Sequence, residues 1–450
     1  SNEGRDYVLR RIIRRALRYA RMIGVHEPFL YKIVDSIVAI MGDYYPEVKT
    51  GAASVKNLLE GEEKRFLETL ENGMDRLEET MKSLRSAGKS EMGGRDAFVL
   101  YDTFGFPLEM TVEIAKEQGL AVDIEGFNAE MERQRERGKQ SWKGADTGSE
   151  KLLAELSKKA GPTPFLGYER ERAESEIMFL GAGSSLAKKL ERGAEGMMVT
   201  SSTTFYGESG GQVGDHGRIV SGNGSVFEVI DTKKIDRTTV HVGRVLEGSF
   251  AEGDRVATEI DVVRRNLIRA NHTATHLLQA GLRKVLGSHV HQSGSIVEPE
   301  RLRFDFTHFN PMTRDEIAAV EEMVNLKAWE ALPVSTRIMD LQEALKTGAM
   351  AEFGEKYEES VRVVSVEGFS SELCGGTHLD NTGKIGVFRI MREGSPGAGL
   401  RRVEGMTLRG VYERFGQQKD LIERLVALLN VSESGMVKKI EEIMERAHRL

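Results

Sequence analysis

The sequence has little cysteine and no long apolar run. Cys374 is the only cysteine among 450 residues, which excludes an internal disulfide and fits a reducing cytoplasm. No run of about 18 apolar residues occurs, so we expect no membrane-spanning segment. An arginine-rich stretch stands where a signal peptide would have its apolar core, so we expect no secretory leader in this segment. The chain also lacks an initiator methionine, and we expect a fragment of a longer protein.

Length and composition indicate a soluble globular chain of two or three domains. Hydrophobic residues make up 40% of the chain and charged residues 30%. The net charge of −7 by itself disfavours a nucleic-acid partner. Residues 1–21, however, contain seven arginines and only two acidic residues. Because a local basic patch, rather than net charge, marks a nucleic-acid surface, this segment indicates such a partner.

The arginines near the N-terminus share one face of a predicted helix. In residues 6–23 apolar residues recur at helical spacing, which predicts an amphipathic helix. A nearly pure arginine face is typical of phosphate binding, because a guanidinium can bind phosphate through two hydrogen bonds. The alternative is a solvated face whose arginines pair with neighbouring acids. The residues of this face are Arg11, Arg14, Arg15 and Arg18.

The predicted elements divide the chain into four parts. Residues 1–162 show helical periodicity and end in a glycine-containing linker at 143–163. Short β-prone runs separated by glycine turns fill 163–262, which predicts a small β-barrel. Residues 263–410 mix helix and strand patterns and are expected to be α+β, and 411–450 return to helix. That last helical segment is expected either to oligomerise or to pack on its own domain.

Two short motifs concentrate side chains that bind metals. His272 and His276 lie in a predicted helix at residues 262–285, where residues four apart share a face about 5–6 Å apart. Cys374 and His378 form a second pair in a CGGTH segment. Thiolate and imidazole together suit Zn²⁺, so we expect one zinc ion per chain. The alternative is that the histidines belong to an ordinary helix face and that the cysteine is an inert thiol.

Several longer motifs match one family, in that family's order along the chain. They are SNEGR with YVLRRIIRR in residues 1–15, LYDTFGFP at 100–107, FYGESGGQ at 205–212, HTATHLL at 272–278 and CGGTH at 374–378. Together they resemble alanyl-tRNA synthetase over essentially all 450 residues. The resemblance implies a multidomain protein with an all-α helical tRNA-recognition domain, a β-barrel plus α+β editing domain, and a C-terminal helical segment. It also implies that the class II aminoacylation core, which uses ATP and Mg²⁺, lies upstream and is absent, as is the C-terminal domain.

The resemblance assigns tRNA contacts to the first domain. In the family, the asparagine of SNEGR and the aspartate of LYDTFGFP recognise a G·U pair in the acceptor stem, which implies Asn2 and Asp102, with Arg14 as a weaker candidate. Their side-chain oxygens can accept from the guanine amine in the shallow minor groove of RNA. Arg11 and Arg18 are expected phosphate contacts. The expected partner is tRNA(Ala), and the parent protein is a candidate homodimer through its C-terminal helices.

The resemblance also implies a proofreading site. A pocket for alanine discriminates against glycine by only about 1–3 kcal/mol and rejects serine weakly, so mischarged Ser-tRNA(Ala) and Gly-tRNA(Ala) must be hydrolysed. Zn²⁺ held by four ligands would be structural, whereas three ligands would leave a position for water or substrate. We expect His272, His276 and Cys374 to bind firmly and His378 to complete the shell.

The FYGESGGQ segment supplies expected substrate contacts. Gln212 can orient the attacking water or donate to a developing oxyanion. Gly210 and Gly211 let the backbone approach a small substrate, and in the family this pair is associated with amino-acid specificity. Thr203 is a candidate contact for the serine hydroxyl, and Arg402 for the tRNA 3′ end. The alternatives are a glycine hairpin turn with Gln212 on the surface, and a β-turn with exposed charge at Arg402.

Three other functions compete with an editing deacylase that belongs to alanyl-tRNA synthetase. A free-standing editing protein would share the metal motifs but should lack SNEGR and LYDTFGFP, which this chain has. An RNA-binding module would use zinc only structurally. A zinc metalloprotease is disfavoured, because HTATH lacks the glutamate base that the HExxH motif requires.

Overall fold

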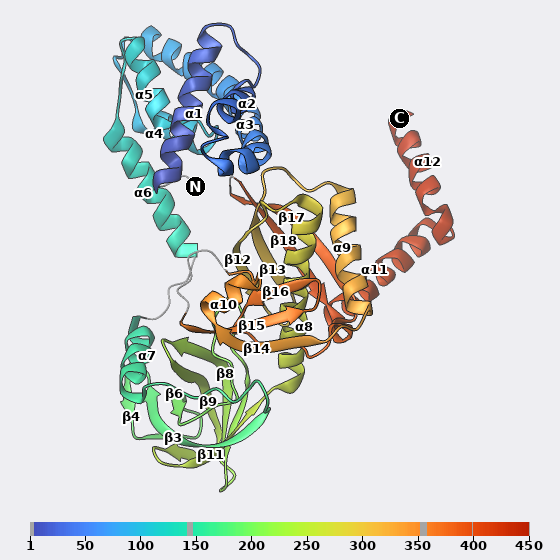
Figure 1. Cartoon of the computed structure of the whole chain (residues 1–450). Helices are drawn as coiled ribbons and strands as arrows, with labels where there is room; N and C mark the ends of the chain where they lie inside the picture. Colours follow the sequence, from blue (N-terminus) through green and yellow to red (C-terminus); the bar gives the residue numbers. More distant parts are fainter. Residues whose placement is uncertain (1–3, 142–146, 352–357, 398, 450) are drawn as a thin grey trace. The chain divides into compact units, whose positions relative to one another are not determined.

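The chain forms two compact units. The computed structural model describes residues 4–141, 147–351, 358–397 and 399–449 (Figure 1). The first unit ends at Asp146, whereas the sequence predicts a boundary after residue 162. The helix α7 (Thr147–Ala160) belongs to the second unit, because Leu152 and Leu156 bury its apolar stripe against barrel residues.

The first unit is built mainly of helices. The helical periodicity of this region is borne out most clearly by the long helix α3, which starts at Pro46, a residue type favoured in a first helical turn. Its apolar stripe is buried at Phe66, Leu70 and Leu77. The helices are α1 (Gly4–Met22), α2 (Leu30–Met41), α3 (Pro46–Ser86), α4 (Gly94–Asp102), α5 (Leu108–Glu117) and α6 (Ile124–Ser141).

The expectation of an all-α first domain is wrong. Two short strands, β1 (Glu91–Met92) and β2 (Ala121–Val122), pair in parallel beside the helices. Met92 is fully buried there, and the pairing satisfies backbone groups that would otherwise lack partners away from water. Strands of two residues are too short to show an alternating pattern, which is why the sequence does not reveal them.

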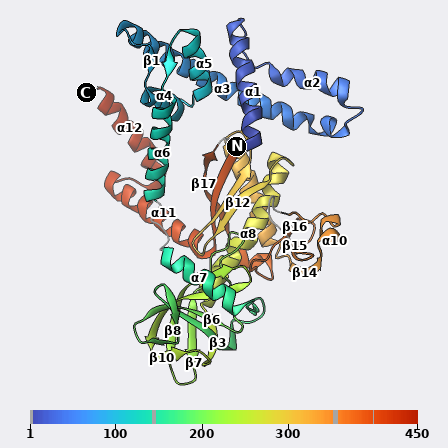
Figure 2. The ribbon, with the colours of Figure 1, turned by 90° about the vertical axis from the view of Figure 1, so that its left-hand side faces the viewer.

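The predicted β-barrel is present in the second unit. Its strands pair in the order β11-β7-β8-β9-β6-β3, and β11 pairs back onto β3, which closes the ring. Figure 2 shows β3, β6, β7 and β8 of this barrel in green. The interior is apolar, with Phe205, Phe227 and Phe250 fully buried. The strands of this region are β3 (Arg172–Ala182), β4 (Ser185–Ala187), β5 (Lys189–Glu191), β6 (Glu195–Thr200), β7 (Gly217–Ser221), β8 (Val226–Ile235), β9 (Thr238–Glu247), β10 (Ser249–Ala251) and β11 (Arg255–Ile260).

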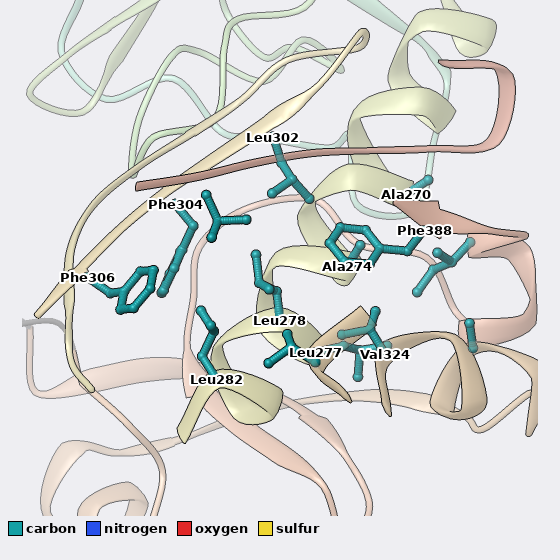
Figure 3. Packing of buried hydrophobic residues seen from close by; sticks show 14 of the residues in the cluster. Ala270, Ala274, Leu277, Leu278, Leu282, Leu302, Phe304, Phe306, Val324 and Phe388 are labelled. Atoms are coloured by element: carbon teal, nitrogen blue, oxygen red, sulfur yellow. The ribbon is translucent and has the colours of Figure 1, made fainter. Parts of the chain in front are cut away.

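Two antiparallel sheets and two long helices follow the barrel. The sheet β12-β13-β18-β17 shares one core with α8 and α9, in which Phe304, Phe306 and Leu277 are fully buried (Figure 3). A second sheet, β14-β15-β16, leads into the CGGTH segment at the end of β16. The elements are α8 (Val262–Leu286), β12 (Gln292–Val297), β13 (Leu302–Thr307), α9 (Arg314–Trp329), β14 (Val334–Asp340), α10 (Leu341–Lys346), β15 (Ser360–Val366), β16 (Ser370–Leu373), η1 (Thr382–Ile385), β17 (Phe388–Gly397) and β18 (Leu400–Thr407).

The C-terminal segment forms two helices that bury none of their described residues. They are α11 (Leu408–Leu429) and α12 (Met436–Arg449), joined through the short η2 (Glu433–Gly435). Large apolar side chains such as Phe415 and Leu428 are exposed on α11. Among the helices that the structure describes, none combines the length and the apolar character that crossing a bilayer requires.

A buried ion pair fixes α8 to the barrel. Arg265 is fully buried near the start of α8, and its guanidinium binds Asp215 through Nε, 2.9 Å from Oδ1, and through Nη2. Its other donors reach the carbonyl oxygens of Gly167 and Thr204, at 2.8 and 2.9 Å. Asp215 also accepts from the backbone N–H of Tyr206 at 2.6 Å. Both buried charges therefore have partners in the barrel.

Replacing Asp215 with alanine should destabilise the second unit strongly. The change leaves the Arg265 guanidinium buried without its carboxylate, and we expect a loss of about 3–5 kcal/mol in the free energy of unfolding. Urea denaturation followed by circular dichroism measures the loss. The matched control is Glu259→Ala, which removes the exposed partner of Arg172 and should cost less than about 1 kcal/mol. Equal losses in the two variants would contradict the anchoring role.

A histidine inside the barrel is held neutral. His241 Nδ1 lies 2.9 Å from the carbonyl oxygen of Met198 and must donate to it, because a carbonyl only accepts. Its Nε2 then accepts from the hydroxyl of Thr203 at 2.8 Å. Burial lowers the pKa of His241 from its ordinary 6.5 to about 4. The imidazole is therefore uncharged at neutral pH.

We expect the second unit to lose stability between pH 7 and pH 5. At pH 5 the unfolded His241 binds a proton that the folded imidazole does not, because its folded pKa is about 4. The stabilisation is complete above pH 6.5, is lost as the pH falls toward 4, and amounts to about 2 kcal/mol of difference between pH 7 and pH 5. Urea denaturation at both pH values measures it. The His241→Gln variant should lose about 2 kcal/mol less than the wild type, and an identical pH dependence would refute the assignment.

Candidate metal centre

The four predicted ligands come together in the second unit. α8 presents His272 and His276 on one face, about one helical turn apart, and both are buried. The loop after β16 brings Cys374 and His378 against that face. One ligand atom from each residue lies within 4.8 Å of the others, so the group can hold a metal ion. We call these four residues the metal cluster.

The distances inside the metal cluster fit tetrahedral coordination. Cys374 Sγ lies 3.4 Å from His272 Nε2 and 3.3 Å from His378 Nε2. Tetrahedral bonds of about 2.3 Å to sulfur and about 2.0–2.1 Å to nitrogen would place two such atoms about 3.5 Å apart. The backbone N–H of Gly376 donates to the same sulfur at 3.3 Å, which favours a thiolate. An added Cβ on Gly376 would lie 2.0 Å from the His272 ring, so glycine permits this approach.

Two neighbouring side chains decide which ring nitrogen faces the metal cluster. Gln212 Oε1 lies 2.9 Å from His272 Nδ1 and accepts from the backbone N–H of Thr377 at 2.8 Å. Because an amide oxygen only accepts, His272 carries its proton on Nδ1 and keeps the Nε2 lone pair for a metal. His378 Nδ1 lies 3.3 Å from the hydroxyl oxygen of Thr273, whose own proton is donated to a carbonyl oxygen of α8. The same tautomer follows for His378.

Burial keeps the three imidazoles neutral. It lowers the pKa of His272 to about 3, and the nearby Arg362 guanidinium is a second cause. Burial also lowers the pKa of His276 and of His378 well below the ordinary 6.5, to which neighbouring imidazoles and Arg362 contribute. Neutral imidazoles offer their lone pairs to a cation. Arg362 itself donates to two carbonyl oxygens of the CGGTH loop, both at 2.9 Å, and so fixes that loop.

The glycine pair of FYGESGGQ forms a tight turn. Gly210 and Gly211 both have positive φ, 55° and 76°, and paired backbone hydrogen bonds between Ser209 and Gln212 close the turn. An added Cβ on Gly211 would lie 2.5 Å from the hydroxyl oxygen of Ser295. The hairpin alternative is therefore present, but Gln212 is fully buried rather than on the surface.

A cavity of about 640 Å³ opens onto the metal cluster. This volume falls in the range of about 300–1,000 Å³ that is usual for ligand sites. His272, His276 and Cys374 line it, and the barrel contributes Tyr206 and Gly210. The cluster is therefore open to a ligand that enters between the barrel and the α+β part of the second unit.

One acidic residue of this cavity was missed by sequence reasoning. Glu372 is buried on β16 and lines the cavity, and its Oε2 lies 3.4 Å from His276 Nε2. Its Oε1 accepts from the hydroxyl of Ser370 at 2.9 Å. A carboxylate in this position can take a proton from water. The available signal was its place two residues before Cys374, because side chains two apart share one face of an extended chain.

Thr203 does not reach the cavity, contrary to the prediction. Its side chain is fully buried inside the barrel. The hydroxyl donates to His241 Nε2 at 2.8 Å and accepts from the backbone N–H of Phe205 at 3.0 Å. Because its proton is committed to a neutral histidine, the side chain has a place in the barrel, and the structure gives no support to a contact with a serine hydroxyl.

Two of the arginines predicted to contact RNA form ion pairs with carboxylates in the structure. Arg402 forms a bidentate pair with Asp305 on the neighbouring strand, with both N···O distances 2.7 Å. Arg18 is buried and binds Glu113 at 2.9 Å and Glu117 at 2.6 Å. Because each guanidinium is already paired within the fold, the structure does not favour these two arginines as RNA contacts, and that role stays a prediction.

The other predicted tRNA contacts fall in the first unit. Asn2 lies outside the described residues. Asp102 is exposed at the end of α4 and accepts a hydrogen bond from Gln134 at 2.5 Å. Arg11 and Arg14 line a cavity of about 270 Å³ together with the proline of the LYDTFGFP motif. The structure thus brings two of the predicted arginines to one of the family-like motifs.

Two family models match the chain. Residues 1–264 match the model described as tRNA synthetases class II (A). Residues 361–404, which include Cys374 and His378, match the threonyl and alanyl tRNA synthetase second additional domain. The chain belongs to the alanyl-tRNA synthetase family. The resemblance seen in the sequence motifs is thereby confirmed at the level of the family.

Curated alanine–tRNA ligases match this family member along its whole length. The chain is 46% identical over 452 residues to the ligase of Xanthomonas axonopodis pv. citri, and 43% identical over 460 residues to that of Parvibaculum lavamentivorans. The ligase of Pelotomaculum thermopropionicum is 42% identical over 452 residues. Each match covers 100% of this chain but only 50%, 51% and 52% of the respective relatives. The chain spans about half the length of the curated relatives it matches.

The class II match corrects two expectations. It begins at residue 1, which contradicts the prediction that this chain lacks the class II synthetase region and that ATP and Mg²⁺ belong only to a missing part. The match also runs through the helices of the first unit and into the closed barrel. The family region therefore contains sheet as well as helix, and a separate all-α recognition domain at its start is not supported.

Loss of the Gln212 oxygen should weaken metal binding. Gln212→Leu removes the acceptor that holds the proton of His272 on Nδ1, and we expect a Zn²⁺ affinity about 10–100-fold lower. Competition with a chromophoric chelator measures the affinity. The matched control is Gln279→Leu, at a buried glutamine that lines the same cavity and contacts Met350 rather than a ligand. Equal affinities in wild type and Gln212→Leu would rule out this support of His272.

Proposed function

We propose that the second unit hydrolyses mischarged Ser-tRNA(Ala) and Gly-tRNA(Ala) with Zn²⁺ bound at the metal cluster. The observation that supports it most is the opening of this cluster onto a cavity of about 640 Å³. A purely structural zinc site needs no such access, whereas a hydrolytic site must admit its substrate. Membership of the alanyl-tRNA synthetase family supplies the substrate class.

The protein's part in this reaction begins with ligand orientation. A bound Zn²⁺ would polarise the ester carbonyl or lower the pKa of a water molecule. Gln212 is fully buried and bonded to His272 and Thr377, so we assign it the orientation of His272 rather than contact with the attacking water. The Gly210–Gly211 turn lies beside the substrate, because Gly210 lines the cavity.

Glu372 is the group that we assign to take the proton of the attacking water. Its Oε2 lies 3.4 Å from Nε2 of His276, a member of the metal cluster that lines the cavity. In the hydrolysis, a bond forms between the water oxygen and the aminoacyl carbonyl carbon. The bond from that carbon to the terminal ribose oxygen breaks, and the proton taken from water is returned to this leaving oxygen.

The first unit is proposed to hold the acceptor stem of tRNA(Ala). Asn2 and Asp102 would contact the base pair, while Arg11 and Arg14, at the cavity beside the LYDTFGFP proline, would meet phosphates. The parent enzyme would attach alanine to tRNA(Ala) with ATP in the cytoplasm. It would dimerise through α11 and α12, whose apolar side chains are exposed.

A second candidate is an RNA-binding module with a structural zinc ion. The closed four-ligand set favours it, because structural zinc sites bind four protein ligands and catalytic sites three. The two candidates differ in turnover. The module would bind Ser-tRNA(Ala) without cleaving its ester.

Deacylation assays test the proposed function. Cys374→Ala should lower the rate of serine release from Ser-tRNA(Ala) by more than about 100-fold, since losing even a group that merely supports a ligand costs about 10–100-fold. Zinc content, measured by mass spectrometry, should fall in the same variant, and a chelator should abolish wild-type turnover. Ser360→Ala, which alters the same cavity away from the cluster, is the control and should retain activity. Full hydrolysis without bound metal would contradict the proposal. Binding of Ser-tRNA(Ala) without turnover would favour the RNA-binding module.

A further inference from the structure

The cavity beside the metal cluster is larger than a small aminoacyl group requires. Its volume of about 640 Å³ equals that of roughly twenty water molecules at about 30 Å³ each. A seryl or glycyl group fills a minor part of this space. On the proposed function, the remaining volume is available to the terminal nucleotide of the tRNA and its phosphate.

Two cations line this cavity without a carboxylate partner among the described residues. Lys234 is exposed on β8 and forms no ion pair with another residue that the structure describes. Arg362 directs its donors to backbone carbonyl oxygens and to the hydroxyl of Thr336. The acidic residues that line the cavity are Glu358, which binds Arg237 at 2.5 Å, and Glu372, which faces the neutral His276. With Arg237, three cationic side chains face two carboxylates in the lining, so an anionic group would meet an excess of positive charge here.

The hairpin that carries Lys234 is firmly placed at the cavity. β8 and β9 pair up to their two-residue tip, where Asp236 has a positive φ of 53°. The carbonyl oxygen of Arg237 accepts from the backbone N–H of Thr163 at 2.9 Å. The hydroxyl of Thr163 accepts in turn from the backbone N–H of Thr239 at 3.1 Å. Both Thr163 and Thr239 line the cavity, so the hairpin forms part of its wall.

We infer that Lys234 binds the phosphodiester that precedes the ester-bearing nucleotide of the substrate. A lysine without an ion-pair partner attracts phosphate as a point charge, and Arg362 adds positive potential within the same cavity. This inference rests on the proposed function and deepens it, because it assigns the nucleic-acid end of the substrate to the β8–β9 hairpin. The metal cluster then acts on the ester while the hairpin positions the chain beyond it.

Lys234→Ala tests the subsite through a split between KM and kcat. With Ser-tRNA(Ala) the variant should raise KM about 5-fold, leave kcat unchanged and reduce the slope of log affinity against log salt by about 1. With a seryl ester of adenosine, which carries no phosphate, it should change neither constant. Lys234→Arg should restore the lower KM. The matched control is Lys188→Ala, at an exposed barrel lysine that does not line the cavity.

A binding measurement separates failure of the subsite from failure of the proposed function. Fluorescence anisotropy with a short unacylated RNA of the tRNA 3′-end sequence should show weaker binding to Lys234→Ala than to the wild type. Weaker binding without any wild-type hydrolysis would support the subsite and refute the hydrolase. Hydrolysis with unchanged KM and RNA affinity in Lys234→Ala would overturn the subsite alone. An equal rise in KM for the phosphate-free ester would also overturn it, because phosphate contact could not be the cause.

Discussion

The ion pair between Arg265 and Asp215 is the constraint on which the candidate centre depends. Arg265 lies two turns before His272, on the same face of α8. Because the pair joins this end of the helix to the barrel, it fixes where the histidines stand relative to the turn that carries Gln212. The 2.9 Å contact between Gln212 and His272 joins that turn to α8. A buried charge pair is thus the link between barrel geometry and ligand geometry.

The direction of hydrogen bonds is the second constraint on the structure. It sets the same tautomer at two histidines that have different roles. His241 and His272 each donate from Nδ1 to an oxygen that can only accept, so each keeps Nε2 free of a proton. In the barrel, that nitrogen accepts from Thr203 and the histidine is structural. In the metal cluster, it faces the sulfur of Cys374 at 3.4 Å. What surrounds Nε2, not the residue type, separates the two roles.

Features set by neighbours close in sequence could be predicted. Helical periodicity predicted the helix at residues 262–285, which is present as α8. The capping box of α9, with Thr313 and Glu316 in reciprocal hydrogen bonds, is a local pattern of the same kind. The HxxxH and CxxxH spacings likewise identified all four members of the metal cluster, because each pair is local. The sequence predicted a β-barrel but not which strands pair to close it, because strand pairing depends on contacts that no short pattern records.

The contacts that the sequence did not predict involve residues whose partners are remote in sequence. Arg402 is paired to Asp305, 97 positions away, and Arg18 to Glu113, 95 positions away. A charged side chain looks the same in sequence whether it meets RNA or a carboxylate brought close by folding. Glu372 was overlooked for a related reason, because its neighbour His276 belongs to another element. Such pairings become visible only when the tertiary structure is known.

The two halves of the metal cluster also have a topological consequence. His272 and Cys374 are 102 positions apart, so one ion bound to both would tie a loop of that length. In the chain-entropy description, a cross-link over about 100 residues removes about 4.7 kcal/mol of conformational freedom from the unfolded chain. A bound ion would therefore cross-link the whole segment between α8 and β16. Without the metal, the protein would have a less restricted unfolded ensemble as well as an altered site.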